Sequence, residues 1–179
     1  MSMWRVATLV CVLIAAVWGL GACSSPSKQL DTLTQAEPNS TRQRAMRRLS
    51  LASAYYEQNQ IDVAQQEVRA ALQIDPNYAD AYSLLGLIHQ RANAAVLAQQ
   101  SFEQALQLAS QAPVRSAELG AIQHNYGWFL CEQKRFAQAQ VQFAHALSQP
   151  SYASPDKTNK AIVFCKQRAA QADTPQRNH

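Results

Sequence analysis

Histidines and cysteines are the residues of this chain that could hold a metal ion or act as nucleophiles, and there are four of each. His89, His124 and His145 lie in segments with helical patterning. None has a second His or a carboxylate four residues further on, the spacing that places two metal ligands on one helix face. The chain has no Gly-rich phosphate loop, no His-Glu-x-x-His, no Cys-x-x-Cys and no Gly-x-Ser-x-Gly. We therefore predict that the protein is not an enzyme and uses no metal, cofactor or small-molecule substrate.

The N-terminal segment ends at a cysteine that could carry a lipid. Arg5 precedes an apolar run over residues 6–20, which is typical of a secretory signal and is shorter than the ~20 apolar residues of a spanning helix. The run Leu-Gly-Ala-Cys that ends at Cys23 resembles the lipobox of bacterial lipoproteins. This resemblance implies that residues 1–22 are removed and that Cys23 is acylated, and Ser24 implies an outer-membrane address on the periplasmic face. The alternative is cleavage at an ordinary secretory site, which would leave Cys23 as a plain thiol.

The charge pattern argues against a nucleic-acid partner. The formal net charge is only +4, and the basic residues are dispersed along the chain. One cluster stands at helical spacing in a segment that also has apolar positions, and it comprises Arg42, Arg44, Arg47 and Arg48. A solvated helix face near a membrane explains this cluster better than a nucleic-acid site. We predict contact with a membrane through the lipid and no nucleic-acid binding.

Two polar segments surround the region that can fold. Residues 23–41 carry Ser, Thr, Pro, Asn and Gln with few apolar residues, which predicts a flexible tether, and residues 173–179 form a second polar, disordered tail. Residues 42–172 between them are long enough for one domain with a sizeable core. Gly is rare and the β-branched residues come singly, a composition that favours helices.

Three segments of this region repeat one pattern with a period of about 34 residues: 45–78, 79–112 and 120–153. The pattern is that of a tetratricopeptide (TPR) unit, a pair of antiparallel helices called A and B. Its in-phase residues are Leu51, Ala52, Tyr55, Ala64, Val68, Ala71 and Pro76, then Tyr82, Leu85, Gly86, Ala98, Phe102 and Ala105, then Tyr126, Gly127, Leu130, Ala139, Phe143 and Ala146. Small residues in the middle of helix A and near the start of helix B allow the two backbones to approach closely.

The repeats predict an all-α fold. We expect a TPR-type right-handed α-solenoid of three helix pairs, with short polar turns at 58–60, 91–93 and 133–135. A helix over residues 155–172 would cap the open end of the stack. A longer connection is expected near residues 111–116, because the third repeat starts seven residues late. An Ala-rich helical bundle without repeats is the alternative.

In TPR proteins the ligand usually lies in the concave wall that the A helices form, and resemblance to that superfamily predicts a protein-binding groove here. Its expected residues mix apolar, aromatic and polar groups, which suits a peptide or a helix: Leu49, Ser53, Tyr56, Leu87, Gln90, Arg91, His124, Asn125 and Trp128. Trp128 is the best single anchor, since a large aromatic in a groove is a common hot spot. Its alternative role is packing against the last helix.

Cys131 and Cys165 are 34 residues apart, one repeat, and would occupy equivalent places on neighbouring helices. In an oxidising envelope they could form a disulfide that fastens the cap helix to the third repeat, with a stabilisation of about 3–4 kcal/mol in the chain-entropy model. Two free buried thiols are the alternative, because the helix spacing can exceed what a disulfide tolerates.

The third repeat also carries a more specific pattern. Residues 124–133 read His-Asn-Tyr-Gly-Trp-Phe-Leu-Cys-Glu-Gln and are followed by Phe136 and Ala139. This resembles the Asn-Tyr-Gly-x-Phe-Leu-Cys signature of the PilF/PilW family of type IV pilus biogenesis lipoproteins, and the order of lipobox, polar tether and first repeat agrees. The resemblance covers residues 41–168. Family members usually have six repeats, whereas three and a half are present in this sequence.

The resemblance implies a lipid-anchored periplasmic scaffold that binds the outer-membrane secretin and promotes its localisation or assembly in type IV pilus biogenesis. One alternative is another TPR lipoprotein adaptor, serving outer-membrane protein assembly or peptidoglycan enzymes. A third hypothesis, from a different class, is a peptidoglycan-acting enzyme, which would need carboxylates or histidines gathered in one cleft.

Overall fold

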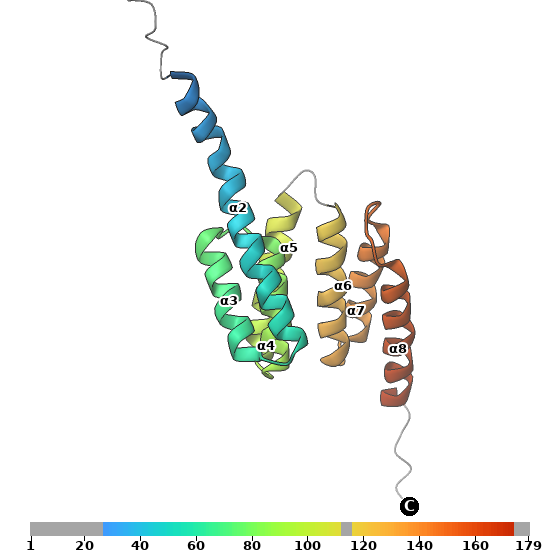
Figure 1. Ribbon diagram of the computed structural model, residues 1–179. Coiled ribbons are helices and arrows are strands. Elements are labelled where there is room, and N and C mark those ends of the chain that lie inside the picture. Colours follow the sequence, from blue (N-terminus) through green and yellow to red (C-terminus); the bar gives the residue numbers. More distant parts are fainter. Residues whose placement is uncertain (1–26, 112–115, 174–179) are drawn as a thin grey trace, which may run out of the picture. The chain divides into compact units, whose positions relative to one another are not determined.

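The computed structural model describes residues 27–111 and 116–173, and all of its regular elements are helices (Figure 1). The signal segment 1–22, Cys23 and the end of the polar tail lie outside the described residues. Seven helices make up this described part: α2 (Ser27–Glu57), α3 (Ile61–Ile74), α4 (Ala79–Arg91), α5 (Ala95–Gln111), α6 (Ser116–Glu132), α7 (Phe136–Ser148) and α8 (Pro155–Asp173). They pack in sequential pairs, as the TPR pattern predicted.

The chain divides into two units, residues 1–38 and residues 39–179, and the packed helices belong to the second. The sequence predicted a polar tether over residues 23–41, whereas α2 already includes residues 27–41. A polar composition does not exclude a helix, because this stretch contains Lys, Gln, Leu, Glu and Ala, all residues of good helix propensity. None of the described helices is both long enough and apolar enough to cross a membrane.

Close approach within the second and third helix pairs depends on glycine. A Cβ atom on Gly86 would lie 2.8 Å from the ring of Phe102, and one on Gly127 would lie 2.7 Å from the ring of Phe143. Both phenylalanines are fully buried. The phenylalanine of helix B therefore fills the place that a side chain on helix A would occupy, which is the packing that the repeat pattern predicted.

The turn within each pair has one residue in the left-handed conformation. Asn59, Asn93 and Lys134 have φ angles of 60°, 59° and 60°. The residue that follows each of them donates its backbone N–H to the carbonyl five residues earlier, at 2.9, 2.8 and 2.9 Å. These bonds satisfy carbonyls that the end of helix A leaves open, so each A helix ends in the same compact turn.

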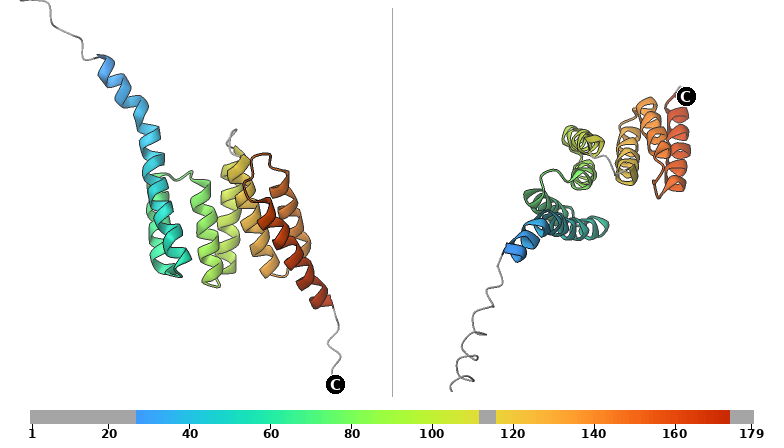
Figure 2. Two further views of the ribbon diagram at one scale, coloured as in Figure 1. Left: turned by 45° about the vertical axis from the view of Figure 1, so that its right-hand side comes forward. Right: turned by 90° about the horizontal axis from the view of Figure 1, so that it is seen from above.

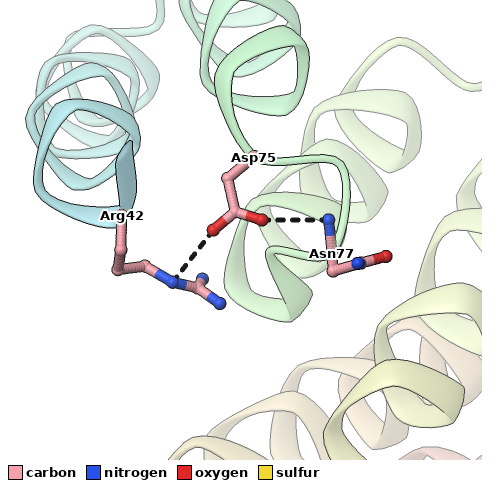
Figure 3. A network of polar contacts seen from close by, with 3 residues as sticks. All are labelled: Arg42, Asp75 and Asn77. Carbon is pink, nitrogen blue, oxygen red and sulfur yellow. Dashed lines mark hydrogen bonds and ion pairs between the residues drawn. The ribbon is translucent and has the colours of Figure 1, made fainter. Parts of the chain in front are cut away.

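An ion pair holds α2 to the end of α3. Arg42 of α2 lies 3.0 Å from a carboxylate oxygen of Asp75, and the other oxygen of Asp75 accepts the backbone N–H of Asn77 at 3.1 Å (Figure 3). The Arg42 guanidinium also lies 4.3 Å from the centre of the Tyr78 ring. Arg48 pairs in the same way with Glu67, at 2.9 Å. Two arginines of the predicted solvated cluster therefore connect the helices of the first repeat.

The core is built mainly from alanine in the first repeat and from aromatic rings further on. Helices α6, α7 and α8 lie side by side (Figure 2). Their buried residues join those of α5 in a cluster where Phe102 stacks on Tyr126 and packs against Phe129, with ring centres 5.5 Å apart in both pairs. This cluster therefore packs helices α5, α6, α7 and α8 together.

Candidate functional site

A cavity of about 440 Å³ opens among the A helices, and most of its lining is apolar. Four helices contribute its walls: Tyr56 from α2, Leu87 from α4, His124, Asn125 and Trp128 from α6, and Lys157, Lys160, Ala161 and Phe164 from α8. Five of the nine predicted groove residues are therefore brought to one place. We call this cavity the inner groove.

The two large aromatic side chains of the inner groove stack on each other. Trp128 and Phe164 have ring centres 5.2 Å apart and an interplanar angle of 24°. Phe164 keeps 42% of its surface exposed. Trp128 thus packs against the last helix and also lines the groove, so the two roles considered for it are compatible. The pair forms a flat apolar surface on which a partner side chain can pack.

His124 lies at the base of the groove and is uncharged at neutral pH. It is 5% exposed, and its Nδ1 lies 2.8 Å from the Oγ1 of Thr158, which in turn lies 2.8 Å from the hydroxyl of Tyr152. Burial, together with the smaller effect of the nearby positive charge of Lys157, lowers the pKa of His124 from 6.5 to about 4. The imidazole therefore acts as a neutral hydrogen-bonding group that joins α6 to α8.

His89 is held similarly on the second repeat. Its Nδ1 lies 3.1 Å from the hydroxyl of Ser101, and its Nε2 lies 3.3 Å from the side-chain amide of Gln65. Burial is the main cause that lowers its pKa. Within residues 27–111 and 116–173, no three His, Cys, Asp or Glu side chains come together in a way that could hold a metal ion.

The four remaining predicted residues lie elsewhere. Leu49 is 8% exposed and belongs to the core of the first repeat, and Ser53 is half-buried outside the cavity. Gln90 donates a hydrogen bond to Glu132 in a separate, polar cavity at the C-terminal ends of the A helices. Arg91 covers the ring of Tyr56, 4.8 Å from its centre, and therefore supports the groove wall from outside.

The repeat position that Leu49 holds in the first A helix is buried in every A helix. The residues at this position are Leu49, Ser83, His124 and Thr158, and none is more than 8% exposed. The side chain of Asn125 donates to Ser83 at 3.1 Å, and His124 pairs with Thr158, so the position connects successive A helices. His124 also lines the inner groove from this position, whereas Leu49 packs in the core of the first repeat.

Helix α8 contributes to the groove, which the predicted set of groove residues did not include. Lys157, Lys160, Ala161 and Phe164 line the cavity, although we expected the last helix only to cap the stack. The repeat pattern already placed Ala161 and Phe164 in phase with a fourth helix A, but the predicted groove residues included none from this helix. The last helix is thus both a cap and a groove wall.

A disulfide joins the two helices that contribute most of the groove. Cys131 of α6 and Cys165 of α8 are bonded, with 5.8 Å between their Cα atoms. Both residues are buried, at 0% and 1% exposure. Since one bond links the helices that carry Trp128 and Phe164, it restrains the spacing of the stacked pair.

The TPR repeat family matches residues 52–93. An uncharacterized protein of Haemophilus influenzae is 35% identical over 129 residues, which cover 72% of this chain and 68% of the relative. The type IV pilus assembly protein PilF of Pseudomonas aeruginosa is 32% identical over 104 residues, which cover 58% of this chain and 38% of PilF.

Two solved structures have the same fold over most of this chain. PilF of Pseudomonas aeruginosa aligns with a TM-score of 0.63 at 25% identity, over 73% of this chain and 56% of that one. PilW, described as a widely conserved type IV pilus biogenesis factor, aligns with a TM-score of 0.63 at 29% identity, over 72% and 56%. The chain thus spans little more than half the length of these two structures. Its fold and its identity to both show that it belongs to the TPR proteins and is related to the PilF and PilW pilus biogenesis factors.

Proposed function

We propose that the protein is a scaffold, anchored in the outer membrane by a lipid on Cys23, that binds the secretin of a type IV pilus system and promotes its localisation and assembly. The observation that supports this most is the inner groove, an apolar cavity built on the segment that carries the PilF/PilW-like signature. TPR proteins are binding scaffolds and are generally non-catalytic, which agrees with a role in assembly.

The lipid would supply the location and the helices would supply the recognition. One acyl chain binds a membrane only reversibly, so stable anchoring of Cys23 calls for more than one chain. A scaffold held at the membrane raises the local concentration of each subunit that it binds. Ring formation by the secretin is then favoured, because subunits meet while they are held at one surface.

The inner groove would hold a segment of the partner through its aromatic pair. Trp128 and Phe164 present a rigid apolar surface with few rotatable bonds, so packing a partner side chain on it loses little conformational entropy. The disulfide behind them restrains the two helices before binding, which lowers the ordering cost of the complex.

A gene deletion with complementation tests the proposal. Outer-membrane fractions of a strain without the gene should contain few heat-resistant secretin multimers, and the cells should lose twitching. The intact gene should restore both, whereas a Trp128→Ala, Phe164→Ala variant should not. Val96→Ala is the matched control, because Val96 is 71% exposed on a B helix away from the groove.

The anchor needs its own test. Labelled palmitate should enter the intact protein and should not enter a Cys23→Ala variant, which should also fail to restore multimers at the membrane. Normal multimers in the deletion strain, with co-purification of outer-membrane assembly or peptidoglycan machinery, would refute the secretin role and favour another TPR adaptor.

A further inference from the structure

The charged side chains that line the inner groove all have one sign. Lys157 and Lys160 are the only ionised side chains in its lining, because His124 is neutral at pH 7 and the other lining residues carry no charge. Both lysines are exposed, and within the described part of the chain neither forms an ion pair. The groove therefore offers two free ammonium groups beside an apolar floor.

Two acidic side chains of α6 and α8 stand close to the lining residues in sequence but do not line the groove: Asp156, next to Lys157, and Glu132. Glu132, one turn beyond Trp128 on α6, accepts a hydrogen bond from Gln90. It lines the separate polar cavity, where Arg168 supplies a positive charge. The inner groove and the polar cavity therefore differ in the charges that line them. Near the start of α8 the charged lining residues are Lys157 and Lys160, with Asp156 beside them outside the lining, whereas the polar cavity near the last turn of α6 is lined by both signs.

The spacing of the lysines from the aromatic pair limits what can fit. Lys160 and Phe164 are four residues apart and share a face of α8, so about 6 Å of helix rise separates them. Lys157 lies about one further turn away. A bound helix would place carboxylates about four and seven residues from its apolar anchor, and an extended segment would place them about two and three residues away.

We propose that the inner groove selects an acidic polypeptide segment, in which a bulky apolar side chain packs on Trp128 and Phe164 while carboxylates within about seven residues of it pair with Lys157 and Lys160. This specificity builds on the proposed scaffold role but does not depend on the partner being a secretin. Complementary charge in such a complex speeds association and fixes the direction in which the segment lies.

A selection of random peptides on the full chain tests this. Peptides of fifteen random residues displayed on phage would be selected against the immobilised chain in 0.05 M and 0.3 M salt. Enriched sequences should combine Trp, Phe, Leu or Ile with Asp or Glu within seven residues. A synthetic peptide of this kind should bind less tightly at the higher salt concentration, because exposed ion pairs are screened.

Charge reversal provides the decisive comparison. A Lys157→Glu, Lys160→Glu variant should lose roughly tenfold in affinity for an enriched acidic peptide, since two exposed pairs become repulsive. Selection on this variant should yield basic peptides instead. Lys166→Glu is the control, because Lys166 is exposed on the same helix and does not line the groove. Glutamate in the first turn of α8 suits the helix dipole, so the variant at residue 157 should fold.

Several results would overturn the proposal. They are enrichment of neutral or basic peptides on the intact chain, the same acidic preference on the charge-reversed variant, or no enrichment at all. A dimer of the full chain that Trp128→Ala abolishes would show that a second copy occupies the groove. The secretin role is scored separately by the multimers in the deletion strain, so acidic selectivity can stand while that role fails, and the reverse is equally detectable.

Discussion

The first repeat and the third repeat use the same positions with different residues. Ala52 and Val68 of the first repeat occupy the places that Gly127 and Phe143 fill in the third. The first repeat thus pairs a methyl group with a valine side chain, whereas the third pairs a glycine, which has no side chain, with a large ring. Ion pairs between Arg42 and Asp75 and between Arg48 and Glu67 link the helices of the first repeat. A disulfide and a buried histidine link the third repeat to α8.

This difference shows that one repeat pattern admits two ways of joining its helices. Ion pairs that remain in contact with solvent contribute little each, so the first repeat depends mainly on close alanine packing. The third repeat carries covalent and buried polar links, and these lie behind the groove residues Trp128 and Phe164. The strongest links are thus found where side chains must be held ready for a partner.

Removing the disulfide should have the largest effect. A Cys131→Ala, Cys165→Ala variant should unfold in denaturant with about 3–4 kcal/mol less free energy of unfolding, because the bond closes a loop of 34 residues. Circular dichroism at increasing urea concentration measures this. Reduction of the intact protein should produce a similar loss. Equal stability of the two proteins would show that the bond contributes nothing to joining α8.

Acid should weaken the third repeat through His124. Its pKa is 6.5 in the unfolded chain and about 4 in the folded chain, so the unfolded state binds more protons between these values. The free energy of unfolding should therefore fall as the pH drops from about 6.5, by about 3 kcal/mol at pH 4. His124→Leu, which places the residue of the first repeat there, should lack this loss. Parallel pH profiles for the two proteins would contradict the assignment.

Replacing Gly127 and Phe143 by the alanine and valine of the first repeat should show that the two positions are energetically coupled. Gly127→Ala should cost about 1–3 kcal/mol, because the new Cβ would meet the buried ring of Phe143. Phe143→Val should also destabilise, by leaving a cavity. The double variant recreates the pair Ala52 and Val68, so it should cost at least about 0.5 kcal/mol less than the sum of the single changes. Thermal unfolding of all four proteins gives the cycle.

Asparagine at position 134, as in the first two turns, should make the protein more stable. Lys134 adopts a left-handed conformation that Asn59 and Asn93 adopt in the equivalent turns. Asparagine tolerates this conformation better than lysine, so Lys134→Asn should stabilise by about 0.5–1 kcal/mol. Lys134→Ala is the control, and it should give no gain. A loss of stability in the asparagine variant would show that the lysine side chain has a role of its own.

The smallest effect is expected at the surface of the first repeat. Arg48→Gln removes the pair with Glu67 and should cost less than about 1 kcal/mol, with most of the loss suppressed in 0.5 M salt. Denaturant titrations at two salt concentrations measure it. A loss as large as that of the disulfide would remove the contrast between the two repeats.

The repeat period of about 34 residues predicted most of the fold, because the position of each helix pair depends on spacing along the sequence. Small residues at Ala52, Gly86 and Gly127 and the polar turns located the helix pairs, and the structure has helices on either side of each turn. The start of α2 was harder to predict. Residues 27–41 combine polar character with good helix propensity, and composition alone does not choose between a tether and a helix.

The groove was predictable in its centre and not at its edges. The sequence by itself determined that Tyr56, Leu87, His124, Asn125 and Trp128 share the inner side of the A helices, because a fixed period fixes the face on which a residue lies. Only the tertiary structure decided that Leu49 is buried, that α8 supplies four of the nine groove residues, and that two lysines give the groove its charge. These features depend on how one helix rests against the next, and the distance and tilt between helices follow from packing of side chains that are far apart along the chain.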